Sequence, residues 1–302
     1  MEIKDFSNWE EYEDNSMGSG RSEKIWLTSG NGIGLFKFPK QFSDGSITTE
    51  YFTEKLAADI ADLLDVPCSD VDIGTYNGRL GSMSYKINRS NEFLLEGVSF
   101  INKSYPNYDI EKLYDPEKQL YYSFQMVFPI IAGLGFEREF VEMVAFDALI
   151  GNSDRHHSNW ALLVSFTKPN ELFVRFSPLY DNGSSLCCYI NESSIDSFLG
   201  KDTQRLLSLV TTKSKSRIRI DGSIKKEPQH TEVLEYMSRR KELKTILFPF
   251  LEKTMARMTP QKINDLLVDY PNSLVSDKRK ELIQRFLINK LRLIKTILEK
   301  GG

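Results

Sequence analysis

Two polar stretches decide how this chain is expected to fold: Gly151-Asn152-Ser153-Asp154-Arg155-His156-His157-Ser158-Asn159-Trp160 and Tyr180-Asp181-Asn182-Gly183. In the first stretch, Asp154 and Asn159 stand five residues apart. In the second, Asp181 follows after a segment with the length of one hairpin. Each of these three side chains carries oxygen atoms, the ligand atoms that Mg²⁺ prefers. The flanking residues determine whether the three side chains meet.

The flanking residues predict a helix, a loop and a hairpin, in that order. Residues 137–150 have the apolar spacing of a helix, and Gly151-Asn152 is a typical helix stop. Residues 160–166 and 172–176 are expected to be two strands, joined by a turn at residues 168–171. This hairpin would return Asp181 to the side of Asn159, so that one metal ion could contact both.

Such an arrangement fits phosphoryl transfer. One carboxylate positions the attacking hydroxyl, and two oxygen ligands hold the Mg²⁺ that spans the phosphates. The five-residue spacing is that of the catalytic aspartate and the metal-binding asparagine in protein kinase catalytic loops. We therefore predict that Asp154 orients the hydroxyl and that Asn159 and Asp181 bind the metal.

The first part of the chain predicts a nucleotide site. A glycine-rich loop, Gly18-Ser19-Gly20-Arg21-Ser22, precedes two apolar runs that are joined at Asn31-Gly32, a typical hairpin turn. Backbone N–H groups of such a loop can bind phosphate oxygens, although most clusters of this kind are only turns. Lys37 lies inside the second apolar run, where a buried ammonium needs a partner; the alternative is an edge lysine that reaches solvent.

The next helix, predicted from Thr48 to Leu64, would supply that partner. Glu54 is our first choice because it shares a side with small alanines, and Glu50 is the second; the alternative is two solvated glutamates. A second hairpin follows, and its last strand ends in Met83-Ser84-Tyr85. We expect these three residues to begin a hinge whose backbone binds an adenine ring.

This order of elements predicts an α+β fold with two lobes, like that of a protein kinase. Residues 1–88 would form a small, β-rich N-lobe, and residues 89–302 a larger, mainly helical C-lobe. Within the C-lobe, residues 93–95 and 121–134 suggest packed helices, and further helices are expected at 233–250, 259–268 and 278–298. The acidic residues 1–16 are expected to be a solvated leader.

Composition excludes several classes of protein. The chain has 302 residues, 40% of them hydrophobic, and a net charge of −3, so no bulk basic field favours direct nucleic-acid binding. Its three cysteines form no disulfide framework. Neither a signal peptide nor a membrane-spanning run is visible. We therefore expect a protein that is cytoplasmic where it is made.

Four cations alternate in the polar region 184–230: Lys213, Lys215, Arg217 and Arg219. They predict a strand-like segment, and most charge runs of this kind are solvated faces. The alternative is a basic ribbon that binds an acidic or phosphorylated substrate.

Several motifs resemble those of the HipA-like serine/threonine kinases. They are Asp154-x-His156-x-x-Asn159 after Leu149-Ile150-Gly151, Pro178-Leu179-Tyr180-Asp181 after the hairpin, Phe52-Thr53-Glu54 and Gly74-Thr75-Tyr76. The last two resemble the short form of the family, without the amino-terminal subdomain of full-length HipA toxins. The resemblance covers about residues 17–190, and its catalytic and metal motifs are more specific than its glycine-rich loop.

The resemblance implies an ATP- and Mg²⁺-dependent kinase that acts on a protein substrate. Lys37 would contact the α- and β-phosphates and be held by Glu54, while His156 would brace the catalytic loop. Autophosphorylation would fall on a serine of the glycine-rich loop, for which Ser19 and Ser22 are the candidates.

The resemblance also implies a toxin or effector role, with an antitoxin-like protein as a candidate partner and translocation out of the cell as a candidate fate. The chain departs from the family at Ser158, where many relatives have a lysine. A cation near the transferring phosphate would then be missing, and Arg155 is a candidate replacement.

Three other interpretations are open at this stage. Asp-Arg-His-x-x-Asn also resembles the catalytic loop of phosphoinositide-type lipid kinases, in which the acceptor is a lipid or a small molecule. Asp154, His156 and His157 could instead bind a transition metal. The fold could also be a nucleotide-binding module without catalysis. A lipid kinase would label lipid vesicles, and a metal protein would retain zinc or iron after purification. A binding module would bind nucleotide without turning it over.

Overall fold

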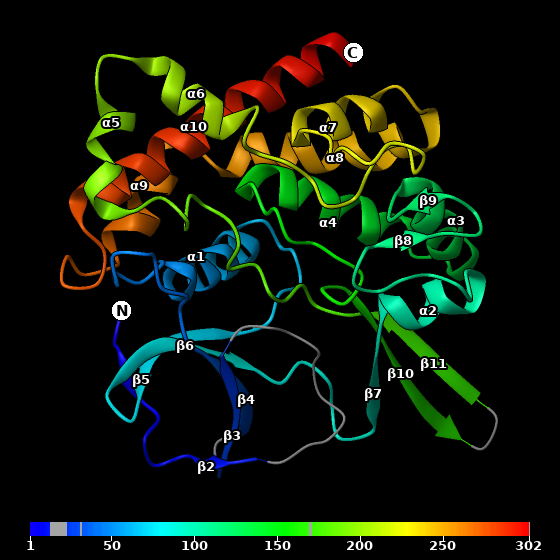
Figure 1. The fold of residues 1–302 in the computed structure, drawn as a ribbon, viewed down its shortest axis with the longest axis horizontal. Helices are drawn as coiled ribbons and strands as arrows, with labels where there is room; N and C mark the ends of the chain where they lie inside the picture. Colours follow the sequence, from blue (N-terminus) through cyan, green and yellow to red (C-terminus); the bar gives the residue numbers. More distant parts are fainter. Residues whose placement is uncertain (13–22, 31, 169–170, 302) are drawn as a thin grey trace.

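The computed structural model describes residues 1–12, 23–30, 32–168 and 171–301 of the chain. A β-sheet built from the first part of the chain lies on one side of the molecule, and a group of helices from the last part lies on the other (Figure 1). Helix α1, Glu50–Leu63, lies between them. Strands β10, Ala161–Lys168, and β11, Glu171–Phe176, form a hairpin that extends away from the helices.

The first sheet has six strands in the order β1-β5-β6-β4-β3-β2. Their bounds are β1 Lys4–Asp5, β2 Glu10–Glu11, β3 Lys24–Ser29, β4 Gly32–Lys37, β5 Val71–Tyr76 and β6 Arg79–Tyr85. The pairs β3–β4 and β5–β6 are antiparallel and correspond to the two predicted hairpins. Asn77 and Gly78 both have positive φ, +49° and +75°, as a tight two-residue hairpin turn requires.

Residues 1–12 are not the solvated leader that their acidic composition suggested. β1 pairs in parallel with β5, and β2 pairs with β3, so this segment forms both edges of the sheet. Between the two strands, Phe6 is 2% exposed and packs edge-on against Phe36. Glu10 and Glu11 stay exposed. The exposed acidic residues suggested a solvated segment, but one buried aromatic ring anchors this segment to the sheet.

Helix α1 carries an acidic residue toward the interior. Phe52, Leu56 and Ile60 are buried in the same core as the C-terminal helices. The helix ends at Leu63, before Pro67, as proline predicts. Glu54 is 2% exposed, which means that its carboxylate needs hydrogen-bond donors from the protein.

The prediction of a helix at residues 93–95 is wrong, because these residues lie in β7, Glu92–Glu96. β7 pairs with β10, Ala161–Lys168, which pairs with β11, Glu171–Phe176. A run of three apolar residues fits a strand as well as a helix, and here the pairing with β10 decides. The elements between β7 and β10 are α2 Gly97–Ser104, β8 Tyr114–Asp115, β9 Leu120–Tyr121, α3 Phe124–Leu134 and α4 Glu137–Ile150.

After β11 the described chain is mainly helical. Its elements are η1 Glu192–Ser194, α5 Asp196–Leu199, α6 Thr203–Val210, α7 His230–Ser238, α8 Lys241–Arg257, α9 Pro260–Val268 and α10 Asp277–Gly301. The single helix predicted at 233–250 is in fact two, because the backbone is extended at Arg240 and α7 turns to pack against α8. None of the helices in the described ranges is both long and apolar enough to cross a bilayer.

Candidate active site

The loop of residues 152–159 begins where α4 ends. Gly151 has φ +69°, the left-handed conformation that glycine adopts without strain, and a Cβ there would lie 2.8 Å from the Phe286 ring. Asn152 is buried and donates from its side chain to Asp147 Oδ1 at 3.0 Å, while its own Oδ1 accepts from the Asp154 amide at 3.0 Å. The start of the loop is therefore fixed to helix α4.

Arg155 is the centre of a buried hydrogen-bond network beneath this loop. Its side chain is 1% exposed and donates twice to the Asp147 carboxylate, at 2.9 Å each. It also donates to the carbonyl oxygens of Asn159 and Tyr180, at 2.6 and 2.8 Å, and to Asn182 Oδ1 at 2.6 Å. Because these partners come from α4, the loop and the segment after β11, one guanidinium holds all three together.

The network places Asp154 and Asn159 on the same loop, beside the cleft. Asn159 is 5% exposed, and its side-chain amide donates to the Asp154 carbonyl at 2.7 Å. Its amide oxygen has no hydrogen-bond donor among the described residues, so it could face a cation. The Asp154 carboxylate is 38% exposed. Burial raises the pKa of Asp154, and His156 and Arg217 oppose that rise.

Asp181 lies directly after the segment that Arg155 holds. It has φ +56°, a conformation that is uncommon for a residue with a side chain and that is often found at functional sites. Its Oδ1 accepts from Lys37 Nζ at 2.8 Å. The structure therefore brings the predicted nucleotide lysine to the predicted metal-binding aspartate.

Glu54 reaches the same place but has different main partners from those we expected. Its Oε2 lies 4.0 Å from Lys37 Nζ, at the limit of an ion pair. Its two oxygens accept from the backbone amides of Asn182 and Gly183, at 2.8 and 2.7 Å. Glu54 thus holds the backbone that follows Asp181, in addition to facing Lys37. The second choice, Glu50, pairs with Lys40 instead.

The charges of this cluster support one another. Burial alone would raise the pKa of Asp181, but the adjacent Lys37 outweighs it and the pKa falls to about 2. Burial also opposes the charge of Lys37, but Asp181 and Glu54 raise its pKa above the ordinary value. At neutral pH the site therefore holds a carboxylate and an ammonium in contact, which suits a nucleotide phosphate and its cation.

A cleft of about 700 Å³ opens at Lys37 and Asp181, within the range of small-molecule sites. Asp154 and Glu54 line a small pocket of about 60 Å³ that shares Lys37 and Asp181 with the cleft. Lys37, Asn159 and Asp181 line the cleft together with apolar side chains from the first sheet, such as Trp26 and Leu35. The polar cluster and an apolar wall therefore share one cavity, as a nucleotide with phosphates and a base requires.

The hinge predicted at residues 83–85 falls on the last three residues of strand β6. Met83 is fully buried in the sheet, although Ser84 and Tyr85 line the cleft. The backbone amide of Tyr85 donates to the Asp70 carbonyl, and that of Lys86 donates to the Ile33 carbonyl, at 2.9 Å each. Backbone that is free of strand pairing begins only at residue 87. Residues 87–90 also line the cleft, so they are better placed than Met83 to contact the adenine base of a nucleotide.

The two adjacent histidines face different partners. His156 Nδ1 accepts from the Ser158 amide at 3.1 Å, a bond within the loop. His157 Nδ1 lies 3.0 Å from the Tyr108 hydroxyl, and burial lowers the pKa of His157 to about 4. Within the described ranges, no group of three or more His, Cys, Asp or Glu side chains is placed to bind a metal ion. The transition-metal interpretation gains no support from this geometry.

Some predicted site residues lie outside the described residues. These are the whole glycine-rich loop and both phosphorylation candidates: Gly18, Ser19, Gly20, Arg21 and Ser22.

Sequence reasoning missed the role of Arg155. It was a candidate for a cation near the transferring phosphate, but its guanidinium is buried on Asp147 and cannot serve there. The missed signal was Asp147 itself, which lies on the apolar side of its predicted helix. A carboxylate in that position requires a buried cationic partner.

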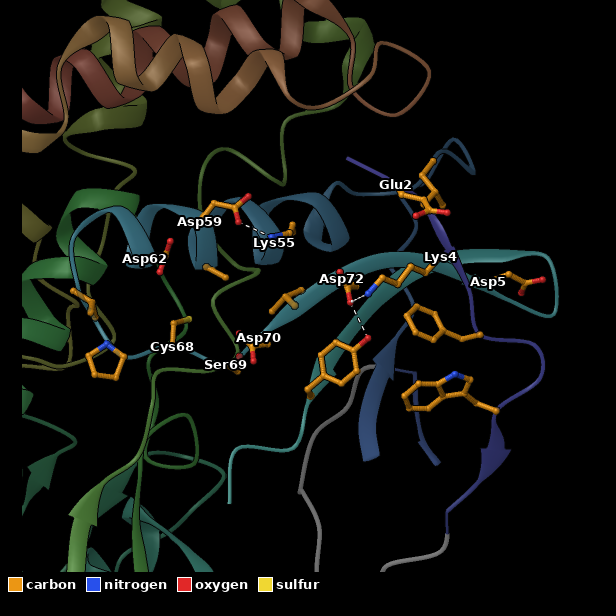
Figure 2. Close-up of a pocket in the computed structure, with 18 of the residues that line it drawn as sticks. Glu2, Lys4, Asp5, Lys55, Asp59, Asp62, Cys68, Ser69, Asp70 and Asp72 are labelled. Atoms are coloured by element: carbon orange, nitrogen blue, oxygen red, sulfur yellow. Dashed lines mark hydrogen bonds and ion pairs between the residues drawn. The ribbon is translucent and has the colours of Figure 1, made fainter. Parts of the chain in front are cut away.

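A second, larger cavity, of about 1470 Å³, is lined by residues of β1, α1 and β5 (Figure 2). It is lined by seven carboxylates, but several are already paired. Lys4 contacts Asp72 at 2.6 Å, and Lys55 contacts Asp59 at 2.5 Å. None of the predicted catalytic or metal-binding residues lines this cavity. The candidate active site is therefore the smaller cleft that holds Lys37 and Asp181.

Comparison with known proteins begins with sequence. No protein-family model matches the chain. The serine/threonine-protein kinase CtkA of Helicobacter pylori, strain J99, is 26% identical over 199 residues, which cover 62% of this chain and 57% of CtkA. The match thus spans little more than half the length of that relative.

Comparison of structures extends over nearly the whole chain. The crystal structure of the Helicobacter pylori proinflammatory kinase CtkA matches with a TM-score of 0.81 and 19% identity, over 99% of this chain and 98% of CtkA. HipA of Shewanella oneidensis MR-1, solved in a toxin–antitoxin complex with HipB and operator DNA, matches with a TM-score of 0.59 and 15% identity, over 95% of this chain and 68% of HipA. The predicted α+β, protein-kinase-like fold is confirmed, and so is the resemblance to HipA-like proteins of the CtkA type.

Proposed function

We propose that this chain, which resembles CtkA in sequence and in fold, is an ATP- and Mg²⁺-dependent protein serine/threonine kinase. One observation carries the proposal. Asp154 and Asn159 share a loop held by Arg155. The same arginine bonds to the Tyr180 carbonyl and to the Asn182 side chain, on either side of Asp181, whose carboxylate contacts Lys37. Phosphoryl transfer depends on positioning and on charge stabilisation, and this cluster supplies both.

Asp154 would receive the acceptor hydroxyl. In the transfer, the bond between the γ-phosphorus and the bridging oxygen of ATP breaks, and a new bond forms to the serine or threonine oxygen. The hydroxyl proton passes to the Asp154 carboxylate, and ADP leaves. A partly exposed carboxylate on a fixed loop suits this role, because it is accessible and its backbone is held by the bond to Asn152.

Asn159 and Asp181 fit Mg²⁺. The Asp181 carboxylate is 45% exposed and keeps its charge because its pKa is about 2, and the Asn159 amide oxygen has no hydrogen-bond donor among the described residues. These are hard oxygen donors of the kind that Mg²⁺ prefers. Bound by these two residues, Mg²⁺ would offset the negative charge of the phosphates. Lys37 would contact the α- and β-phosphates, and Glu54 would keep the backbone after Asp181 in place.

The test is phosphoryl transfer from Mg-ATP to a degenerate serine/threonine peptide library, with intact-mass spectrometry of the protein itself. We expect phosphate on peptide or protein for the wild type and for Asp70→Ala, a control carboxylate that lines the other cavity. We expect none for Asp154→Ala or Asp181→Ala. No transfer by the wild type, together with no thermal shift on adding Mg-ATP, would falsify the proposal. Label that enters phosphoinositide vesicles but not peptides would favour a lipid kinase instead.

Two further proposals concern the regulation and the partners of such a kinase. We infer autophosphorylation at Ser19 or Ser22, to be tested by mapping the phosphate after the incubation above. We also infer a toxin or effector role with a protein partner, since HipA of Shewanella oneidensis was solved with HipB. Co-purification of a second protein from the native host is the measurement that checks this.

A further inference from the structure

An extended segment between α6 and α7 passes next to the catalytic loop. It contains the four alternating cations, and it is held by bonds at two places. The amide of Ser216 donates to the Pro228 carbonyl at 2.9 Å, and Phe124 donates to the Arg219 carbonyl at 2.8 Å. Ile218 is 1% exposed. The residue between these anchors, Arg217, is therefore carried by a well-fixed backbone.

Arg217 points toward the predicted catalytic carboxylate. Its Nη1 donates to Glu227 Oε1 at 2.7 Å, which sets the direction of the guanidinium. Its Nη2 lies 3.6 Å from Asp154 Oδ1, close enough for attraction but too far for a hydrogen bond. Its Nε is buried without a hydrogen-bond partner. The group is thus oriented and charged, and its Nη2 faces Asp154 without a hydrogen bond to it.

Lys24, Lys86 and Arg89 line the cleft but not the small pocket that Asp154 lines. Three cations closer to the catalytic loop are each engaged. Lys37 is bonded to Asp181, Arg155 is buried on Asp147, and Lys40 is bonded to Glu50. His156 is engaged within the loop, where its Nδ1 accepts from the Ser158 amide. Within the described ranges, Arg217 is the cation that forms an ion pair with Asp154. An acceptor oxygen at Asp154 would receive an anionic phosphoryl group within reach of this guanidinium, and a fixed cation there stabilises the charge that develops.

We propose that Arg217 contacts the phosphoryl group as it passes from ATP to the acceptor oxygen beside Asp154. This inference rests on the proposed kinase function and adds a residue to it from a segment outside the catalytic loop. It also gives a role to one member of the alternating basic run. Arg219, by contrast, is 7% exposed and donates to the Lys225 carbonyl, so it serves the segment itself.

The test compares Arg217→Ala and Arg217→Lys with Lys213→Ala, which removes an exposed cation of the same segment that lies 5.8 Å from the Phe198 ring. In the peptide assay we expect kcat of Arg217→Ala to fall about 100-fold, the size found for losing one such donor, with KM for ATP unchanged. Arg217→Lys should recover part of the loss, and Lys213→Ala should match the wild type. Equal melting temperatures would show that folding is intact.

A second measurement does not depend on turnover. Aluminium fluoride with Mg-ADP imitates the phosphoryl group in transfer. It should raise the melting temperature of the wild type beyond the shift from Mg-ADP alone. Arg217→Ala should lose this extra shift and keep the Mg-ADP shift. An unchanged kcat, or a raised KM for peptide with unchanged kcat, overturns the inference, and the second result would assign Arg217 to an acidic group of the substrate. If the wild type transfers no phosphate at all, the proposed function itself fails.

Discussion

Arg155→Met should be among the most damaging single substitutions in the catalytic loop. The wild-type side chain makes five hydrogen bonds, two of them to Asp147. Methionine fills similar space but leaves the Asp147 carboxylate, which is 4% exposed, with the Asn152 side chain as its described donor. Removing one partner of a buried ion pair typically costs about 3–5 kcal/mol. We expect the free energy of unfolding to fall by about that amount.

Urea unfolding measures this loss, and two further variants give it meaning. Arg79→Met removes a guanidinium that also makes two bonds to one carboxylate, Glu23, but at the surface, so it should change stability little. The double variant Asp147→Asn with Arg155→Met should recover much of the loss, because no unpaired charge remains. The reasoning is refuted if Arg155→Met costs less than about 1 kcal/mol, or if the double variant is the less stable of the two.

Two further predictions concern the surroundings of the site. Gly183→Ala should weaken nucleotide binding and cost about 1 kcal/mol or more, because its Cβ would lie 3.0 Å from Glu54 Oε2; Gly133→Ala, in α3 with open space around it, should instead stabilise by about 0.5–1 kcal/mol. Equal denaturation midpoints for these two variants would contradict the prediction. Lys290 is buried against Ser214, and burial lowers its pKa to about 7 from the ordinary value of 10.5. Between these pH values the unfolded chain binds a proton that the folded chain lacks, so stability should rise with pH by up to about 1.4 kcal/mol per pH unit. Lys290→Met should abolish that rise. Parallel stability curves for the variant and the wild type from pH 7 to 9.5 would show that Lys290 does not cause the rise.

Much of the fold followed from local sequence patterns. The helix at residues 137–150 has the bounds that its periodicity predicted, since its apolar positions recur over four turns. The hairpin at Asn77-Gly78 followed from two residues that adopt positive φ readily. The order helix, loop, hairpin and aspartate was also readable, because each step is short and has its own signal.

The misses have a common physical cause, which is that distant pairing decides them. β1 and β2 have two residues each, too few for any periodicity, and they exist because β5 and β3 offer edges. The run at 93–95 became a strand because β10 lies beside it. The direction of the Arg155 side chain depends on Asp147, which lies eight residues earlier, in the last turn of α4. Spacing along the chain indicates which residues are near one another but not which way a long side chain turns.

The packing of α1 bears on how the cleft can open. Its Phe52 ring packs edge-on against Tyr270, its Tyr51 hydroxyl donates to the Leu274 carbonyl, and Arg257 donates to the carbonyl of its last residue, Leu63. These partners all belong to the C-terminal helices or their loops. Helix α1 also packs on β5 and β6 of the first sheet, so it is attached to both parts of the molecule. Any movement of the sheet relative to the helices would have to loosen one of these two sets of contacts, which means that the packing of α1 helps to set the distance between Lys37 and Asp181.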